Sequence, residues 1–285
     1  MGATTARALD RLLDVLTGSL GPPLIAMSAG VDSCTLAHVA QELHGEGALA
    51  VTLSTESTST EELADARSFA IEHRVRHRVI AHSELADPAY VANRLDRCYH
   101  CRRGMAEALW EVARSTGHGW IAMGVVTDDL AEHRPGLQAA REAGIRFPFV
   151  EAAIDKRTVR AIARQRGLKV ALRPANACLS SRIEPLLPVT RGRLRQIERA
   201  ERAVRELSGV TLVRVRHHGE HARIEVLPED RGRVLARAAA VGRALRDLGF
   251  DRVGLDLAGY RSGSMVAPYV DASAAPSPAS AQAAF

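Results

Sequence analysis

The sequence predicts an α/β protein built on a parallel sheet, followed by a small α+β domain. Short apolar runs at 24–28, 48–53, 76–81 and 120–125 alternate with segments of helical periodicity. This alternation is typical of a parallel sheet that helices cover on both faces. Hydrophobic residues make up 46% of the 285 residues and charged residues 25%, a balance that allows a packed core and excludes a wholly disordered chain.

The remaining elements divide the chain into two domains and a tail. Helices are expected at 33–44, 60–73, 102–116 and 156–166. Loops are expected at 127–136 and at 173–190, where four prolines surround the segment ACLSSR. After them we expect a basic helix at 191–208, strands at 211–216 and 222–227, a helix at 229–247 and a strand at 252–257. We therefore expect a first domain over 1–170, a second over 171–266, and a disordered tail over 267–285 that is rich in Ala, Ser and Pro.

Charge and hydropathy limit the partners. The formal net charge of +5 suits an anionic small substrate or a nucleic acid, but only 4% of residues are aromatic, so base-stacking surfaces and a nucleic-acid partner are not expected. No apolar stretch approaches the roughly 20 residues that span a bilayer. The amphipathic N-terminus lacks the apolar core of a signal peptide, so a cytoplasmic location without a membrane partner is expected. The basic helix at 191–208 is interpreted as a solvated face or a subunit contact of a homo-oligomer.

A polar turn follows the first predicted strand. Its residues are Ser28, Ala29, Gly30, Val31, Asp32 and Ser33. A strand-to-helix turn presents free backbone N–H groups at the positive end of a helix, which suits a pyrophosphate, and Gly30 allows close approach. Asp32 would act through Mg²⁺. The spacing matches neither the Walker A pattern nor the dinucleotide fingerprint, and an ordinary turn capped by serines is the alternative interpretation.

The turn and three later segments resemble a known family. SAGVDS resembles the SGGxDS signature of the PP-loop ATP pyrophosphatases (adenine nucleotide alpha hydrolase-like proteins), which cleave ATP between the α and β phosphates and adenylate a substrate. The segments TDDLAEHRPGLQAAREAGIRFPFVEAAIDK, RPANACLSSRIE and LVRVRHHGEHARIEV closely resemble the LarE family of ATP-dependent sulfur transferases. The resemblance covers about residues 20–260.

This resemblance implies a substrate and a set of residues. The family's substrate is a pyridinium dicarboxylate mononucleotide derived from nicotinic acid adenine dinucleotide, and its product is a thiocarboxylate on the path to the nickel-pincer cofactor. The implied sulfur-bearing residue is Cys178, and the implied cofactors are ATP and Mg²⁺. The implied nucleotide-binding residues include Gly124. The implied substrate- and phosphate-binding residues are Asp128, Asp129, Arg134, Arg182, Arg214, Arg216 and Glu225.

The chain departs from the family pattern at several positions. Ala29 replaces the second glycine of the turn, and the block G-T-N-x-D-D becomes Gly124-Val125-Val126-Thr127-Asp128-Asp129. A tryptophan expected before a Lys-Pro is Ala171, with Arg173 in place of the lysine. The sulfur chemistry is kept, while thiolation of another small carboxylate and thiolation of tRNA stay open as alternatives.

The four cysteines leave two sulfur sources open. An adenylated carboxylate has a leaving group, so a thiolate at Cys178, with Arg182 nearby in sequence, can attack its acyl carbon. If the bond between Cβ and sulfur then breaks, Cys178 is sacrificed as dehydroalanine. Alternatively, Cys98, Cys101 and Cys178 would hold a [4Fe–4S] cluster with one open iron. Cys34 is interpreted as a small buried apolar residue.

Overall fold

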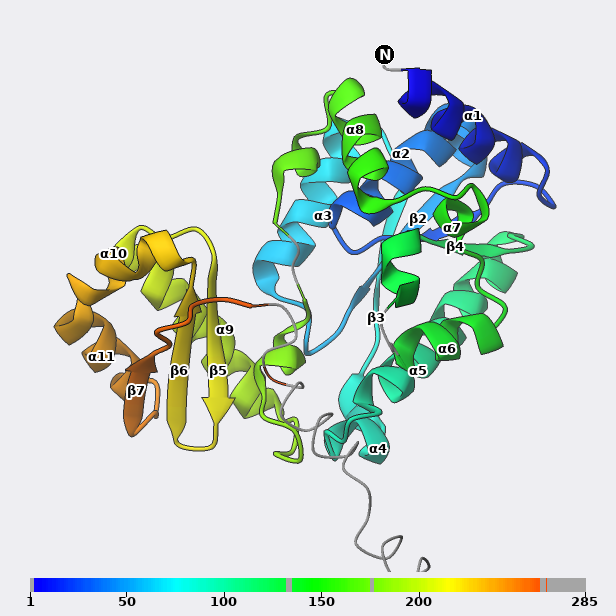
Figure 1. Cartoon of the computed structure of the whole chain (residues 1–285). Helices are drawn as coiled ribbons and strands as arrows, with labels where there is room; N and C mark the ends of the chain where they lie inside the picture. Colours follow the sequence, from blue (N-terminus) through cyan, green and yellow to red (C-terminus); the bar gives the residue numbers. More distant parts are fainter. Residues whose placement is uncertain (1–2, 132–134, 175–176, 262–264, 266–285) are drawn as a thin grey trace, which may run out of the picture. The chain divides into compact units, whose positions relative to one another are not determined.

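The computed structural model describes residues 3–131, 135–174, 177–261 and 265 (Figure 1). The chain divides into two compact units, one comprising Met1–Tyr90 with Asp96–Ala177 and the other Val91–Leu95 with Cys178–Phe285. The first unit holds a sheet of parallel strands and the second a small mixed sheet, which confirms the predicted fold class. The division after Ala177 falls later than the boundary expected at 170, and a short segment before α5 joins the second unit.

The first unit is built on a four-stranded parallel sheet in the order β3-β2-β1-β4. Its strands are β1 (Leu24–Ala26), β2 (Leu49–Ser54), β3 (His77–Ala81) and β4 (Ile121–Met123), so all four predicted strands are confirmed. Leu24 of β1 pairs with Leu49 of β2 on one side and with Ile121 of β4 on the other. Because the strands are parallel, their carboxyl ends meet at one edge, where such sheets bind ligands.

Helices cover both faces of this sheet, which explains the continuous apolar runs (Figure 1). One face packs against α1 (Ala3–Thr17), α2 (Val31–His44), α3 (Thr60–Glu72) and α8 (Lys156–Gln165). The other packs against α5 (Arg97–Thr116) and α6 (Pro135–Glu142). Neighbouring residues of β1 point to opposite cores, with Ile25 in the first and Leu24 in the second.

Several helices of the first unit differ from those expected. Helix α5 begins at Arg97 rather than at 102, so both Cys98 and Cys101 lie in it. The segment 127–136 was expected to be a loop, but Thr127–Ala131 forms a 3₁₀ helix and α6 begins at Pro135. Proline ends a helix when it lies in the interior, but it is favoured in the first turn. The short helices α4 (Pro88–Val91) and α7 (Pro148–Glu151) had no periodicity that could predict them.

The second unit is a three-stranded sheet packed against helices on one face. Its strands are β5 (Val213–His218), β6 (His221–Val226) and β7 (Arg252–Leu255). Strands β5 and β6 are antiparallel, and β6 and β7 are parallel. The packed helices are α9 (Arg191–Ser208), α10 (Arg231–Leu235) and α11 (Ala238–Asp247). The single helix expected at 229–247 is therefore interrupted.

None of the helices in the described part of the chain is both long and apolar enough to span a bilayer. The predicted tail at 267–285 lies outside the described residues.

Candidate active site

The turn between β1 and α2 is closed by the hydroxyl groups of its two serines. The backbone N–H of Ser28 donates to Oγ of Ser33 at 3.0 Å, and that hydroxyl donates to the carbonyl of Gly30 at 3.2 Å. Helix α2 begins at Val31, directly after its N-terminal cap Gly30. The six residues predicted as a phosphate loop therefore form one compact turn that ends in the first turn of a helix, where backbone N–H groups and the helix dipole attract phosphate.

Ala29 adopts a backbone conformation that favours glycine. Its φ is +54°, in the left-handed region, and its side chain is buried. A residue with a Cβ atom costs about 1 kcal/mol there. The turn thus has the backbone conformation that a second glycine would adopt, and the methyl group of Ala29 lowers the stability of the fold.

Gly124, at the carboxyl end of β4, lies directly against the start of α2. A Cβ atom at this position would lie 2.8 Å from the carbonyl carbon of Asp32 and 2.8 Å from the backbone nitrogen of Ser33. These are backbone atoms that cannot move aside without moving the turn. Glycine is therefore required at 124, and the predicted Gly124 does lie beside the predicted turn.

Lys156 is a residue of this site to which the sequence analysis gave no role. Its Nζ forms an ion pair with Oδ2 of Asp32. Its backbone N–H, in the first turn of α8, donates to Oδ2 of Asp128 at 2.8 Å. The residue follows Asp155, the N-cap of α8, so in the sequence it resembles an ordinary helix start. Lys156 does end the segment TDDLAEHRPGLQAAREAGIRFPFVEAAIDK, whose resemblance to the LarE family could have indicated a role for it.

Asp32, the carboxylate of the turn, has a raised pKa. Burial raises its pKa, and the nearby Asp129 raises it further, while Lys156 opposes both. Its Oδ1 is buried and has no hydrogen-bond partner in the described part of the chain. A buried, unsatisfied carboxylate oxygen close to a second carboxylate is a donor set that fits Mg²⁺. Asp129 also accepts a hydrogen bond from the backbone N–H of Val126 at 3.1 Å.

Two further residues near the turn are Arg173 and Cys34. Nη1 of Arg173 forms an ion pair with Asp65 at 2.8 Å and lies 3.5 Å from the carbonyl oxygen of Ala29. Burial raises the pKa of the Cys34 thiol to about 12. Cys34 is therefore protonated at neutral pH, as expected for a small buried apolar residue.

Arg134, expected to bind phosphate, lies outside the described residues.

Cys178, in the second unit, is held by its neighbours in the segment ACLSSR. It caps the short 3₁₀ helix Leu179–Arg182 and is half-buried, with Sγ 3.1 Å from Oγ of Ser180. Nη1 of Arg182 donates to the carbonyl oxygen of Cys178 at 2.8 Å, while its Nε donates to Oε1 of Glu201 at 3.0 Å. Arg182 is only 1% exposed. Its guanidinium therefore fixes the backbone that carries the thiol.

Arg214, Arg216 and Glu225 lie together on β5 and β6. Arg214 and Arg216 alternate with the core valines of β5, so both side chains project from the other face of the strand. Arg216 donates to Oε2 of Glu225 through Nε at 2.8 Å and Nη2 at 2.6 Å. Burial and the neighbouring Arg182 lower the pKa of Arg214. Nη1 of Arg216 also donates to the carbonyl oxygen of Ser181 at 3.4 Å, so these arginines lie close to the segment that carries Cys178. Guanidinium groups are suited to binding an anion.

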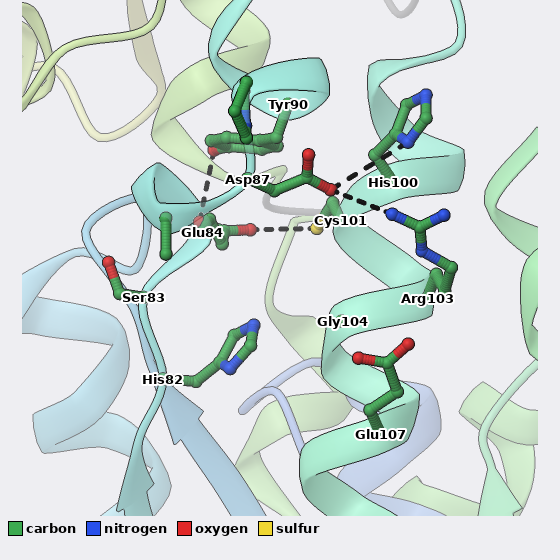
Figure 2. Close-up of a pocket in the computed structure, with 12 residues that line it drawn as sticks. His82, Ser83, Glu84, Asp87, Tyr90, His100, Cys101, Arg103, Gly104 and Glu107 are labelled. Atoms are coloured by element: carbon green, nitrogen blue, oxygen red, sulfur yellow. Dashed lines mark hydrogen bonds and ion pairs between the residues drawn. The ribbon is translucent and has the colours of Figure 1, made fainter.

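Cys98 and Cys101 lie in the first unit, at the start of α5. Cys98 is exposed, and the thiol of Cys101 donates to Oε1 of Glu84 at 2.8 Å (Figure 2). Within the described ranges, no group of three or more His, Cys, Asp or Glu side chains is arranged to hold a metal ion. Cys178, the third thiol of the cluster considered from the sequence, lies in the second unit. The [4Fe–4S] cluster therefore stays a prediction.

A parallel sheet with a serine-closed, glycine-lined turn after its central strand, followed by an aspartate on the next helix, defines the PP-loop class of ATP-using proteins. Comparison with known sequences gives the family. The chain is 35% identical over 243 residues to the pyridinium-3,5-bisthiocarboxylic acid mononucleotide synthase of Lactiplantibacillus plantarum, with 85% of this chain and 87% of the synthase covered. It belongs to the family of that enzyme, the LarE family.

Two uncharacterized proteins are also similar. One, from Synechocystis sp., is 39% identical over 251 residues, which are 87% of this chain and 93% of the relative. The other, from Methanocaldococcus jannaschii, is 28% identical over 240 residues, which are 84% of this chain and 90% of the relative. No protein-family model matches the chain.

Proposed function

We propose that this protein is an ATP-dependent sulfur transferase that adenylates a carboxylate of a pyridinium-3,5-biscarboxylate mononucleotide and converts it to a thiocarboxylate. The observation that carries the proposal is the 35% identity with the synthase over 85% of this chain, a match too long to lie within one unit. The geometry of each unit supports one half of the reaction.

The first unit suits adenylation. The N–H groups at the start of α2 would bind the phosphates of ATP, and Lys156 would place a positive charge beside them. Asp32 would hold Mg²⁺, which would neutralise part of the phosphate charge. A substrate carboxylate oxygen then attacks the α-phosphorus, and pyrophosphate leaves with the electrons of the broken bond. The product is an acyl adenylate, whose leaving group is AMP.

The second unit suits sulfur transfer. The thiolate of Cys178 attacks the acyl carbon, AMP leaves, and a thioester forms. Loss of the Cα proton of Cys178 then breaks the bond between Cβ and sulfur. The sulfur leaves with the bonding electrons as a thiocarboxylate, and dehydroalanine stays in the chain. Each protein molecule supplies one sulfur atom in this scheme, and no metal cluster takes part.

The arginines of the second unit suit a small anionic substrate. Arg182 acts as a positioning residue, because its hydrogen bond holds the carbonyl of Cys178. Arg214 and Arg216 supply positive charge for the phosphate of the mononucleotide. Glu225 keeps Arg216 in place through two hydrogen bonds.

The decisive experiment is intact-protein mass spectrometry after a single turnover with ATP and the dicarboxylate. We expect the protein to lose the mass of one H₂S and a peptide map to assign the loss to position 178. Cys178→Ala is expected to give no thiocarboxylate while retaining substrate-dependent ATP–pyrophosphate exchange. Cys98→Ser is the matched control and is expected to behave like wild type. Thiocarboxylate formation by a protein of unchanged mass would refute the sacrificial scheme.

A further inference from the structure

The segment that follows β7 turns back across β6 and brings Tyr260 to a fixed place in the second unit (Figure 1). Oδ1 of Asp256 accepts hydrogen bonds from the backbone N–H groups of Ala258 at 2.8 Å and Gly259 at 3.2 Å, which closes a tight turn. The backbone N–H of Tyr260 then donates to the carbonyl oxygen of Val226, the last residue of β6, at 2.8 Å. Gly259 has a φ of +76°, and a Cβ atom there would lie 2.8 Å from the same carbonyl oxygen, so this position requires glycine.

The ring of Tyr260 lies against the guanidinium group of Arg214. Cζ of Arg214 is 5.5 Å from the centroid of the ring, which is within the reach of a cation–π contact. Arg214 is only 7% exposed, and Tyr260 is half-buried. A cation–π contact that is shielded from water is stronger than the same contact on an open surface.

The surroundings of Arg214 oppose its positive charge. Burial lowers the pKa of Arg214, and the charges of Arg182 and Arg216 lower it further. Arg216 is held by Glu225, whose carboxylate takes up its Nε and Nη2 donors. The negative face of an aromatic ring offsets part of the penalty in a different way, because it attracts the guanidinium without using N–H donors. Those donors are the groups with which an arginine binds a phosphate.

We propose that Tyr260 is a positioning residue of the phosphate site, whose ring holds the guanidinium of Arg214 where it binds the phosphate of a mononucleotide. The inference rests on the proposed function, in which Arg214 supplies positive charge for that phosphate. Tyr260 acts on the affinity for the mononucleotide and takes no part in the transfer of adenylate or of sulfur. The turn capped by Asp256, the glycine at 259 and the backbone bond to Val226 all serve to place this one ring.

The test is isothermal titration calorimetry of the full chain without ATP. The probe is nicotinic acid mononucleotide, which carries a pyridinium ring, a carboxylate and one phosphate. Tyr260→Leu is expected to weaken binding about 10-fold, which is within the range of a cation–π contact shielded from water. Tyr260→Phe keeps the ring and is expected to bind within about twofold of wild type. Leu257→Ala is the matched control, because Leu257 lies in the same turn but is 78% exposed, and wild-type affinity is expected.

Inorganic phosphate gives a second measurement, because it occupies the phosphate site alone. Its affinity is measured by displacement of the mononucleotide and is expected to fall by the same factor in Tyr260→Leu. A merely structural role would disturb the whole site, so the mononucleotide would lose more affinity than phosphate does, and the positioning role would be overturned. In ATP–pyrophosphate exchange with the dicarboxylate, Tyr260→Leu is expected to need about 10-fold more substrate for half the maximal rate, while the maximal rate stays unchanged.

The outcomes separate this inference from the proposed function. Tyr260→Leu that binds the mononucleotide as tightly as wild type would overturn the inference and leave the proposed function standing. Equal weakening in Tyr260→Phe and Tyr260→Leu would show that the hydroxyl group acts rather than the ring, and would also overturn it. A wild-type chain that does not bind the probe, or from which phosphate does not displace it, would remove the phosphate site itself, and with it both the inference and the proposed role of Arg214.

Discussion

The side chain of Lys156 forms an ion pair with Asp32 across 124 residues of sequence and joins the start of α8 to the first turn of α2. The same lysine binds Asp128 through its backbone N–H. One residue thus connects the phosphate loop to the acidic block that follows β4. In the proposed reaction its positive charge would lie beside the leaving pyrophosphate.

Replacing Lys156 by alanine is expected to lower substrate-dependent ATP–pyrophosphate exchange about 100-fold, the loss typical when one charge-stabilising group is removed. Lys156→Arg keeps the charge and is expected to lose less. Lys169→Ala is the matched control, because Lys169 forms an exposed ion pair with Glu72 and is expected to leave exchange unchanged. Exchange at the wild-type rate in Lys156→Ala would remove Lys156 from the proposed site.

Ala29→Gly is expected to stabilise the protein by about 1 kcal/mol, because glycine adopts a positive φ without strain. Urea unfolding measures this change, and exchange activity is expected to be retained. Ala153→Gly is a useful comparison, since Ala153 also has a positive φ, of 50°, but lies after α7. A destabilised Ala29→Gly would show that the buried methyl group contributes more by packing than its backbone conformation costs.

The core of the first unit could be predicted because its apolar patterns lie within short stretches of the sequence. Strands β1, β2 and β4 are almost wholly buried runs, whereas the edge strand β3 carries His77 and Arg78 and is only partly buried. The polar residues of the turn at 28–33 lie within six consecutive positions. The helix at Pro135 was missed because Pro-Gly also ends helices, and only the packing of Gly136 against the backbone of Cys98 distinguishes the two outcomes. A neighbour 38 positions away in sequence gives no periodic pattern.

The parts of the site that could not be predicted depend on long-range contacts. The segment Val91–Leu95 belongs to the second unit because the side-chain amide of Asn93 donates to the carbonyl oxygens of Glu184 and Leu187, both at 2.8 Å. The ion pair of Lys156 and the hydrogen bond that Glu84 accepts from Cys101 are similar cases. In each case a polar side chain bonds to groups from a distant segment of the chain. A single sequence does not show which distant segment supplies these partners.

The ion pair of Arg216 and Glu225 is expected to be a main determinant of the stability of the second unit. Glu225 is fully buried, and Arg223 also contacts it, at 3.2 Å. Arg216→Met would leave a buried carboxylate poorly compensated and is expected to cost about 3 kcal/mol in unfolding free energy. Adding Glu225→Gln is expected to restore most of that loss.

Arg243→Met, on the exposed side of α11, is the control for this pair and is expected to have little effect on urea unfolding. If the double variant were no more stable than Arg216→Met alone, the loss would come from the missing side chain's packing rather than from the uncompensated charge.

His217 is expected to make stability depend on pH in the acid range. Burial, with a smaller contribution from Arg193, lowers the pKa of His217 from 6.5 to about 4. The neutral ring contacts Oε1 of Gln196 at 2.9 Å and the ring of Phe250. As pH falls below 6.5, the unfolded chain binds a proton at this position that the folded chain rejects, so the stability contribution is complete above 6.5 and lost as pH approaches 4.

Urea midpoints measured between about pH 7 and about pH 4.5 test this sign. His217→Gln, which can still donate to Gln196, is expected to show a smaller fall in midpoint than wild type. Some fall is expected to persist, because burial also lowers the pKa values of His77 and His118. His221→Gln, an exposed position on β6, is expected to match wild type. A fall in His217→Gln as steep as that of wild type would mean that the protons are taken up at those other histidines rather than at His217.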